Sequence, residues 1–175
     1  MGFKALSPLL FALPARRFPH FQIRPLSAQT QRNMTDSKKE DCLFCKIIAG
    51  KIPSTKIFET EHSYAFMDIN PLSKGHCLLI PKEHAVKVHE LSDKSMADIG
   101  LQLGKLSKAV VKATGVKDYN VLQNNGSVAH QVVMHVHFHV IPKPNQEEGL
   151  GIEWPAKKGD MEEIKKLGAA IGAAL

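Results

Sequence analysis

The sequence predicts an α+β fold in which short strands form an antiparallel sheet beside one long helix. Short apolar runs bounded by turn residues occur both before and after a single stretch with helical periodicity. This order differs from the regular alternation of strands and helices that builds a parallel sheet. With 175 residues, of which 43% are hydrophobic and 23% are charged, the chain has the size and composition of one packed domain with a tail.

The first elements are a short helix and a pair of strands. Cys42–Ala49 is apolar enough for a short helix, which Gly50 and Pro53 would end. Ile57–Phe58 and Tyr64–Ile69 are expected to be strands that pair across a polar turn. Both strands precede the long helix.

A third strand and the long helix come next. His76–Ile80 follows a turn that contains Asn, Pro and Gly, and it is expected to be a strand. Ser92 can cap a helix that Gly115 would end. The apolar residues between them have helical spacing: Met96, Ile99, Leu103, Leu106 and Val110.

The remaining strands follow the helix. Tyr119–Gln123 is expected to be a strand, and Asn124–Gln131 is a polar loop. Val132–Ile141 then reads as a long strand, which Pro142 and Pro144 close.

The chain divides into three segments. Residues 39–145 form the domain, and residues 146–175 form a C-terminal extension with a short helix. Residues 1–38 are acid-poor and contain four arginines, which is typical of a mitochondrial targeting leader. A secretory signal built on Ala5–Ala15 and an ordinary disordered tail are the alternatives. Because a polar stretch begins at Met34, a second, cytoplasmic product starting there is also conceivable.

The net charge of +6 does not indicate a surface for nucleic acid. Residues 1–35 contain five basic residues and no acidic one. The rest of the chain contains 18 basic and 17 acidic residues. The body of the chain is therefore nearly neutral, and nucleic acid is not an expected partner. A membrane is not expected either, because no uncharged apolar run reaches the roughly 18 residues that a span needs. Three cysteines are too few for a disulfide framework.

The most informative segment, Met134–Ile141, alternates histidine with hydrophobic residues. His135, His137 and His139 occupy every second position. On a strand, alternate side chains share one face, so the three imidazoles would line one surface while the hydrophobic residues enter the core. Two chemistries use such a row. Imidazoles bind metal ions, and a neutral imidazole attacks phosphorus near pH 7 while its neighbours stabilise charge on the phosphoryl oxygens.

This segment resembles the signature of the histidine triad family, and the resemblance covers about residues 41–145. Other segments match in order and spacing: Cys42–Ile48, Ala65–Pro71, Gly75–His84 and Asn120–Asn124. The likeness is greatest to the nucleotide-binding branch of the fungal kind. It implies a homodimer in which two five-stranded antiparallel sheets, each with one long and one short helix, join into a continuous ten-stranded sheet. It also implies hydrolysis of purine nucleoside 5′-phosphoramidates or aminoacyl adenylates at the α-phosphorus.

The resemblance also implies residue roles. His137 would be the nucleophile and would form a transient nucleotidyl-histidine that water cleaves. His139 and His76 would support the phosphate, Asn124 would hold its leaving-group side, and Gln131 is retained among the catalytic residues.

For the nucleoside, Asp68 would accept hydrogen bonds from the ribose hydroxyls. The apolar purine slot would comprise Leu43, Phe44, Ile47, Ile69 and Leu78. Simple structural roles are the alternatives: a turn for Asp68 and Asn124, and core packing for Phe44 and Ile47.

The run before the triad departs from the family's pattern. Val132 stands where the family has a hydroxyl residue that touches the phosphate and the leaving group, and His130 stands where it has glycine. The resemblance therefore leaves the proton donor for the leaving group undetermined. His130 could supply that proton, or it could be a solvated loop residue. Two other functions also stay open: hydrolysis of dinucleoside polyphosphates, and nucleotide binding with little turnover by a zinc-containing protein.

Cys42 and Cys45 form a pair with two intervening residues, which can hold zinc, act in redox chemistry or be incidental. A structural zinc ion needs four ligands. In zinc-containing relatives the two further ligands correspond to His84 and His135, so the resemblance implies a structural zinc site. The third cysteine, Cys77, is expected to face the core on the opposite side of its strand.

Overall fold

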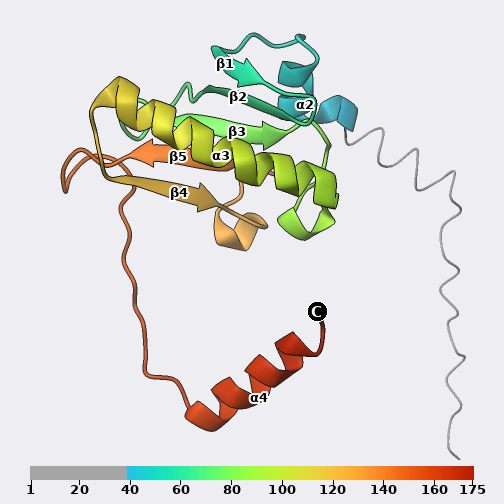
Figure 1. Cartoon of the computed structure of the whole chain (residues 1–175), viewed down its shortest axis with the longest axis vertical. Helices are drawn as coiled ribbons and strands as arrows, with labels where there is room; N and C mark the ends of the chain where they lie inside the picture. The colour runs from blue at the N-terminus through green and yellow to red at the C-terminus, as the bar shows by residue number, and fades with distance from the viewer. Residues whose placement is uncertain (1–38) are drawn as a thin grey trace, which may run out of the picture.

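The computed structural model describes residues 39–175, so the predicted leader lies outside the described residues. Its centre is a five-stranded sheet in which every neighbouring pair of strands is antiparallel, as Figure 1 shows. In spatial order the strands are β1 (Lys56–Glu59), β2 (Ser63–Met67), β3 (Cys77–Pro81), β5 (Phe138–Pro142) and β4 (Tyr119–Gln123). The predicted α+β class with an antiparallel sheet is confirmed.

The long helix α3 (Asp93–Thr114) lies across one face of the sheet (Figure 1). Both of its predicted ends are confirmed. The Ser92 side chain accepts a hydrogen bond from the Ser95 backbone N–H, and Gly115 ends the helix with a φ of 75°, a conformation that favours glycine. The apolar stripe of α3 packs on alternate sheet residues, giving a core of Ala65, Cys77, Leu79, Ile99, Leu106, Val110 and Val140. Cys77 therefore faces the core as predicted.

The short helix α2 (Leu43–Ile48) belongs to a second core on the other side of the strands. Along β3, Leu78 and Ile80 pack with α2, whereas Cys77 and Leu79 pack with α3. This alternation is the period of two that a strand imposes on its side chains. The remaining buried members of the α2 core are Cys42, Phe44, Cys45, Ile47, Tyr64 and Phe66.

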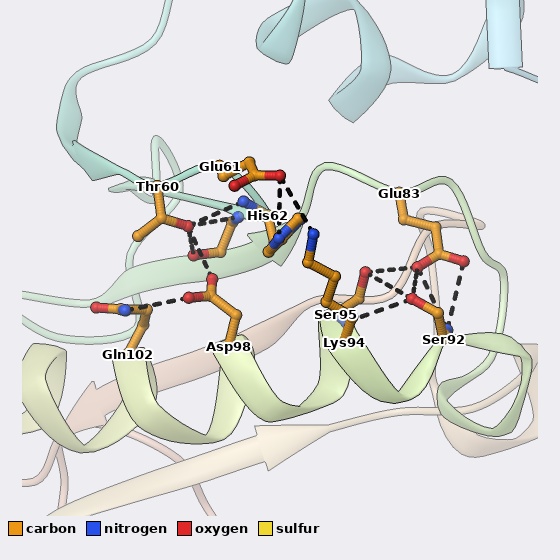
Figure 2. Close-up of polar contacts among 10 residues, drawn as sticks. Thr60, Glu61, His62, Glu83, Ser92, Lys94, Ser95, Asp98 and Gln102 are labelled. Atoms are coloured by element: carbon orange, nitrogen blue, oxygen red, sulfur yellow. Dashed lines mark hydrogen bonds and ion pairs between the residues drawn. The ribbon is translucent and has the colours of Figure 1, made fainter.

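A polar network ties the start of α3 to the sheet (Figure 2). The Thr60 hydroxyl, in the β1–β2 turn, donates to the Asp98 carboxylate over 2.8 Å. The hydroxyls of Ser92 and Ser95 both donate to the Glu83 carboxylate, over 2.7 and 2.5 Å. Glu83 lies two residues after β3 and next to His84, so these bonds fix the helix against the segment that carries His84.

The last strand is shorter than the sequence indicates. The expected strand over Val132–Ile141 begins only at Phe138, where β5 pairs with both β3 and β4. Before that point the chain bonds elsewhere: the Val136 N–H donates to the Ala85 carbonyl over 2.8 Å. The other predicted strands match to within two residues at each end, and β4 matches at both ends.

The C-terminal extension ends in α4 (Met161–Gly172), whose side chains are all exposed. Figure 1 shows this helix away from the sheet. The described residues also form two short 3-10 helices, η1 (Val88–Glu90) and η2 (Ser127–Ala129). Within residues 39–175, no helix has both the length and the apolar character needed to cross a membrane.

Candidate functional site

A pocket of about 450 Å³ opens beside α2 and collects most of the predicted site residues. His137 and His139 line it together with Asp68. The five apolar residues expected to hold a purine also line it: Leu43, Phe44, Ile47, Ile69 and Leu78. Apolar surface at one part of the pocket and imidazoles at another suit a ligand with a flat aromatic group and a phosphate.

The hydrogen bonds of His137 determine which ring nitrogen carries its proton. Its Nδ1 lies 2.6 Å from the His135 carbonyl oxygen, and a carbonyl oxygen can only accept. Nδ1 therefore carries the hydrogen, and the lone pair of the neutral ring is on Nε2. The Phe44 ring packs edge-on against this imidazole, with ring centroids 5.3 Å apart. Burial lowers the pKa of His137, which favours this neutral form with its nucleophilic nitrogen.

His76 orients His139 from behind. The Leu72 backbone N–H donates to His76 Nδ1 over 3.2 Å, so the hydrogen of the neutral His76 ring is on Nε2. That Nε2 lies 2.9 Å from His139 Nδ1 and donates to it. His139 then presents Nε2–H as a donor, the arrangement needed to bind a phosphoryl oxygen. Burial, aided by His137 and His76, lowers the pKa of His139 to about 4 and keeps the ring neutral.

Asp68 makes the turn considered for it and also lines the pocket. Its Oδ1 accepts the Asn70 backbone N–H over 2.8 Å, which is the turn-forming bond of an aspartate at this position. Its Oδ2 lies 3.6 Å from His76 Nε2. Since the carboxylate also lines the pocket, it can accept hydrogen bonds from hydroxyl groups of a ligand.

Three predicted catalytic residues lie outside the lining of this pocket: His76, which contacts His139, and Gln131 and Asn124. Gln131 is 2% exposed, and its side chain bonds only to the backbone: Oε1 accepts from the Gly126 N–H, and Nε2 donates to the Val86 and Val133 carbonyls. Gln131 thus holds the loop in place. Asn124 donates to the His130 carbonyl over 3.4 Å and lines a neighbouring hollow.

The predicted metal ligands converge at a second site behind the pocket. Cys42, Cys45, His84 and His135 place their ligand atoms within 4.8 Å of one another. Sulfur–nitrogen distances are 3.4 Å from Cys42 to His135, 3.6 Å from Cys45 to His135 and 3.3 Å from Cys45 to His84. A tetrahedral zinc ion with bonds of about 2.3 Å to sulfur and about 2.0 Å to nitrogen separates such ligands by about 3.5 Å.

The protonation of His135 also fits a metal. Its Nε2 donates to the Pro81 carbonyl over 2.9 Å, so the lone pair of the neutral ring is on Nδ1, which faces both sulfurs. Burial lowers the pKa of His135 to about 4. Burial and the neighbouring Cys42 raise the pKa of Cys45 to about 12, so a cation is needed to hold its thiolate.

Several residues that line the pocket were not anticipated: Ile52, Pro53, Ser54, Phe66, Asn70 and Val133. The alternation of β2 gave the signal for Phe66, which shares its face with the other α2-side residues. Ile52, Pro53 and Ser54 reach the pocket through the loop after α2, and loop paths leave no periodic signal. His130 and Val132, noted for their unusual identity, also line the pocket.

Known proteins match the part of the chain that contains most of these site residues. The HIT domain profile matches residues 49–146. Adenosine 5′-monophosphoramidase hnt1 of Schizosaccharomyces pombe is 59% identical over 134 residues, which are 77% of this chain and 98% of that protein.

Solved structures of histidine triad proteins are also similar to this chain. A histidine triad nucleotide-binding protein from Candida albicans superposes with a TM-score of 0.71 at 46% identity, over 77% of this chain and 96% of that one. A Zn-bound histidine triad family protein from Mycobacterium smegmatis superposes with a TM-score of 0.60 at 28% identity, over 78% of this chain and 99% of that one.

Proposed function

The chain belongs to the HIT domain family, and from that premise we propose that it hydrolyses purine nucleoside 5′-phosphoramidates and aminoacyl adenylates at the α-phosphorus. The observation that carries the proposal is the protonation of His137. Its Nδ1–H is bound to a backbone carbonyl, which leaves the Nε2 lone pair for attack at the wall of a nucleotide-sized pocket. The named activity of the Schizosaccharomyces pombe relative supports the same reaction.

The reaction takes two displacements. In the first, the Nε2 lone pair of His137 attacks phosphorus, the bond to the leaving group breaks, and a nucleotidyl-histidine forms. In the second, water attacks phosphorus and the electron pair of the P–N bond returns to Nε2. His139 Nε2–H donates to a phosphoryl oxygen as charge develops there, while Asp68 holds the ribose.

Product analysis with two substrates tests this proposal. Adenosine 5′-phosphoramidate should yield AMP and ammonia rapidly, whereas a diadenosine polyphosphate should react slowly. Rapid turnover of only the dinucleotide would instead support the polyphosphate hydrolase.

The second candidate is a nucleotide-binding protein with little turnover. One observation favours it: Val132 lines the pocket and offers no hydroxyl to a leaving group. It predicts that AMP binds while neither substrate is consumed. Calorimetry with AMP, run beside the turnover assay, separates this candidate from the enzyme.

We further propose that the ligand set Cys42, Cys45, His84 and His135 holds a structural zinc ion. The donor types, their separation and the available lone pair of His135 support zinc, as does the Zn-bound relative. With four protein ligands the ion would have no open position for substrate. It would tie the start of α2 to the segment that leads into β5.

A homodimer is also part of the proposal. Strand β4 is an edge of the sheet, and its residues Tyr119 and Val121 are 40% and 46% exposed. An edge strand leaves one row of backbone N–H and C=O groups without partners in the sheet. Pairing of two β4 edges would satisfy these groups and produce a ten-stranded sheet. Sedimentation should give twice the chain mass, and Val121→Pro should give the monomer.

A further inference from the structure

His130 adopts a left-handed backbone conformation, which is uncommon for residues other than glycine. It follows η2 with φ 62° and ψ 22°, and among residues 39–175 it is the single non-glycine residue with a positive φ. Such outliers persist where the surroundings hold them, and they concentrate at functional sites. Glycine takes this conformation without steric cost, and asparagine, aspartate and histidine are the other residues found in it most often.

The surrounding loop holds this conformation firmly. The buried Gln131 side chain accepts from the Gly126 N–H over 2.6 Å and donates to the Val86 carbonyl over 2.7 Å. The His130 N–H donates to the Ser127 carbonyl over 3.0 Å, and the His130 carbonyl accepts from Asn124. The two bonds of His130 use its backbone N–H and carbonyl, so neither engages its imidazole. His130 is exposed and lines the pocket.

His130 also marks one end of the pocket. It lines the 450 Å³ pocket and, in addition, a neighbouring hollow of about 490 Å³ whose walls include Asn124 and Trp154. Among residues 39–175, His130 alone lines both of these hollows. Phe44 and Ile47, which are expected to contact a purine, line the same pocket from the α2 core. A nucleotide whose base enters that apolar part therefore has its leaving group free to extend toward His130.

The other polar groups of the pocket cannot protonate a leaving nitrogen. His137 is the nucleophile, and Asp68 is a carboxylate that accepts hydrogen bonds. His139 can donate a hydrogen bond, but burial lowers its pKa to about 4, so it holds no second proton to transfer. The Ser54 hydroxyl is engaged with the Tyr64 hydroxyl at 3.1 Å. Asn70 and Val132 offer no transferable proton.

We propose that His130 is the general acid that protonates the leaving nitrogen, a role that rests on the proposed phosphoramidate hydrolysis. In the first displacement the P–N bond of the substrate breaks, its electron pair goes to nitrogen, and the His130 imidazolium gives that nitrogen a proton. In the second, the now neutral His130 accepts a proton from the attacking water. His137 is released, and both residues return to their starting protonation states.

Leaving groups of different basicity test this role. An amine leaves phosphorus only with a proton, whereas p-nitrophenolate leaves readily as an anion. His130→Asn and His130→Gly both suit a positive φ, so the loop should keep its shape. We expect each variant to lose about 100-fold or more in kcat/KM for adenosine 5′-phosphoramidate and less than about threefold for the p-nitrophenyl ester of AMP. His89→Asn, at an exposed histidine away from the pocket, is the matched control and should change neither rate.

The outcomes are distinguishable. Equal losses on both substrates, or no loss on either, would overturn the role of His130 while leaving the proposed function intact. A wild-type protein that cleaves neither substrate would overturn both. Unchanged far-UV circular dichroism and thermal midpoints are required of each variant, and a second substitution, His130→Gln, serves if one of them unfolds.

Discussion

At the scale of single residues, the site depends on which nitrogen of each imidazole carries a proton. Backbone groups make that choice for three histidines. The His135 carbonyl fixes Nδ1–H on His137, the Pro81 carbonyl fixes Nε2–H on His135, and the Leu72 N–H fixes Nε2–H on His76. These protonation states suit His137 for the proposed attack on phosphorus, His135 for the proposed metal and His76 for orienting His139. The backbone partner of each ring, and not the side chain itself, makes the difference.

The first prediction concerns the nucleophile. His137→Ala should reduce turnover of adenosine 5′-phosphoramidate by about 10³-fold or more, because no other neutral nitrogen is placed to form the covalent intermediate. AMP binding should change little, since Phe44, Ile47 and Asp68 still line the pocket. Steady-state kinetics and calorimetry measure the two effects. A near-normal rate in the variant would contradict the covalent mechanism.

Much of this site could be predicted from the residues. The alternation in the histidine segment indicated a functional row, and the resemblance assigned His137 and His139 to the pocket where the structure has them. The position of Gln131 outside the pocket lining could not be predicted. Its side chain bonds to backbone groups of Gly126, Val86 and Val133, which come together only in the folded loop.

At the scale of elements, the sequence predicts the end of a helix or strand correctly where neighbouring residues determine it. It fails where pairing with residues distant in the sequence determines it. The ends of α3 follow from Ser92 and Gly115, because caps act within a few residues. The start of β5 does not follow from its own residues. Phe138 begins the strand because it is the first residue with partners on both sides, Leu79 of β3 and Gln123 of β4.

The second prediction concerns the N-terminus of α3. Ser92→Ala removes both the cap of the helix and a donor to Glu83, so the free energy of unfolding should fall by about 1–2 kcal/mol near pH 7. Urea denaturation measures this loss. Ser127→Ala is the control, because Ser127 is exposed and offers no side-chain cap to a helix.

This loss should depend on pH. Hydrogen bonds from Ser95 and then from Ser92 lower the pKa of Glu83. A carboxylate with a lowered pKa stabilises the folded state above its unfolded value of about 4.5, and that contribution is lost as the pH falls through the folded value. The difference between wild type and Ser92→Ala should therefore narrow below about pH 4. If the stability loss of Ser92→Ala stayed constant with pH, the Glu83 carboxylate would contribute nothing to it.

At the scale of the whole molecule, the metal site and the pocket share one segment. His135 presents Nδ1 to the cysteines while its carbonyl oxygen accepts the Nδ1–H of His137. The Phe44 ring packs against both imidazoles, with centroids 5.8 Å from His135 and 5.3 Å from His137. An ion held at the first site would therefore fix the position of the residue proposed to attack phosphorus.

The third prediction tests that site. Purified protein should contain about one zinc ion per chain, and Cys45→Ser should lose it. The thermal midpoint should fall by several degrees, because structural metal binding contributes to folding. Cys77→Ala, in the core on the α3 side, should keep its zinc. A stable wild-type protein without metal after gentle purification would make Cys42 and Cys45 ordinary core residues.

The last prediction concerns the segment before the domain. The described lining of the pocket and the candidate metal ligands lie between Cys42 and His139, so we expect both sites to form without residues 1–38. We propose that those residues direct the chain to mitochondria, because the first 35 carry five positive charges and no negative one. A protein begun at Met34 should fold and turn over substrate at the wild-type rate, yet stay in the cytosol. A slower rate would place the segment in the site. A diffuse cytosolic signal from a fluorescent protein fused behind residues 1–38 would refute targeting, since an import signal acts on any protein that follows it.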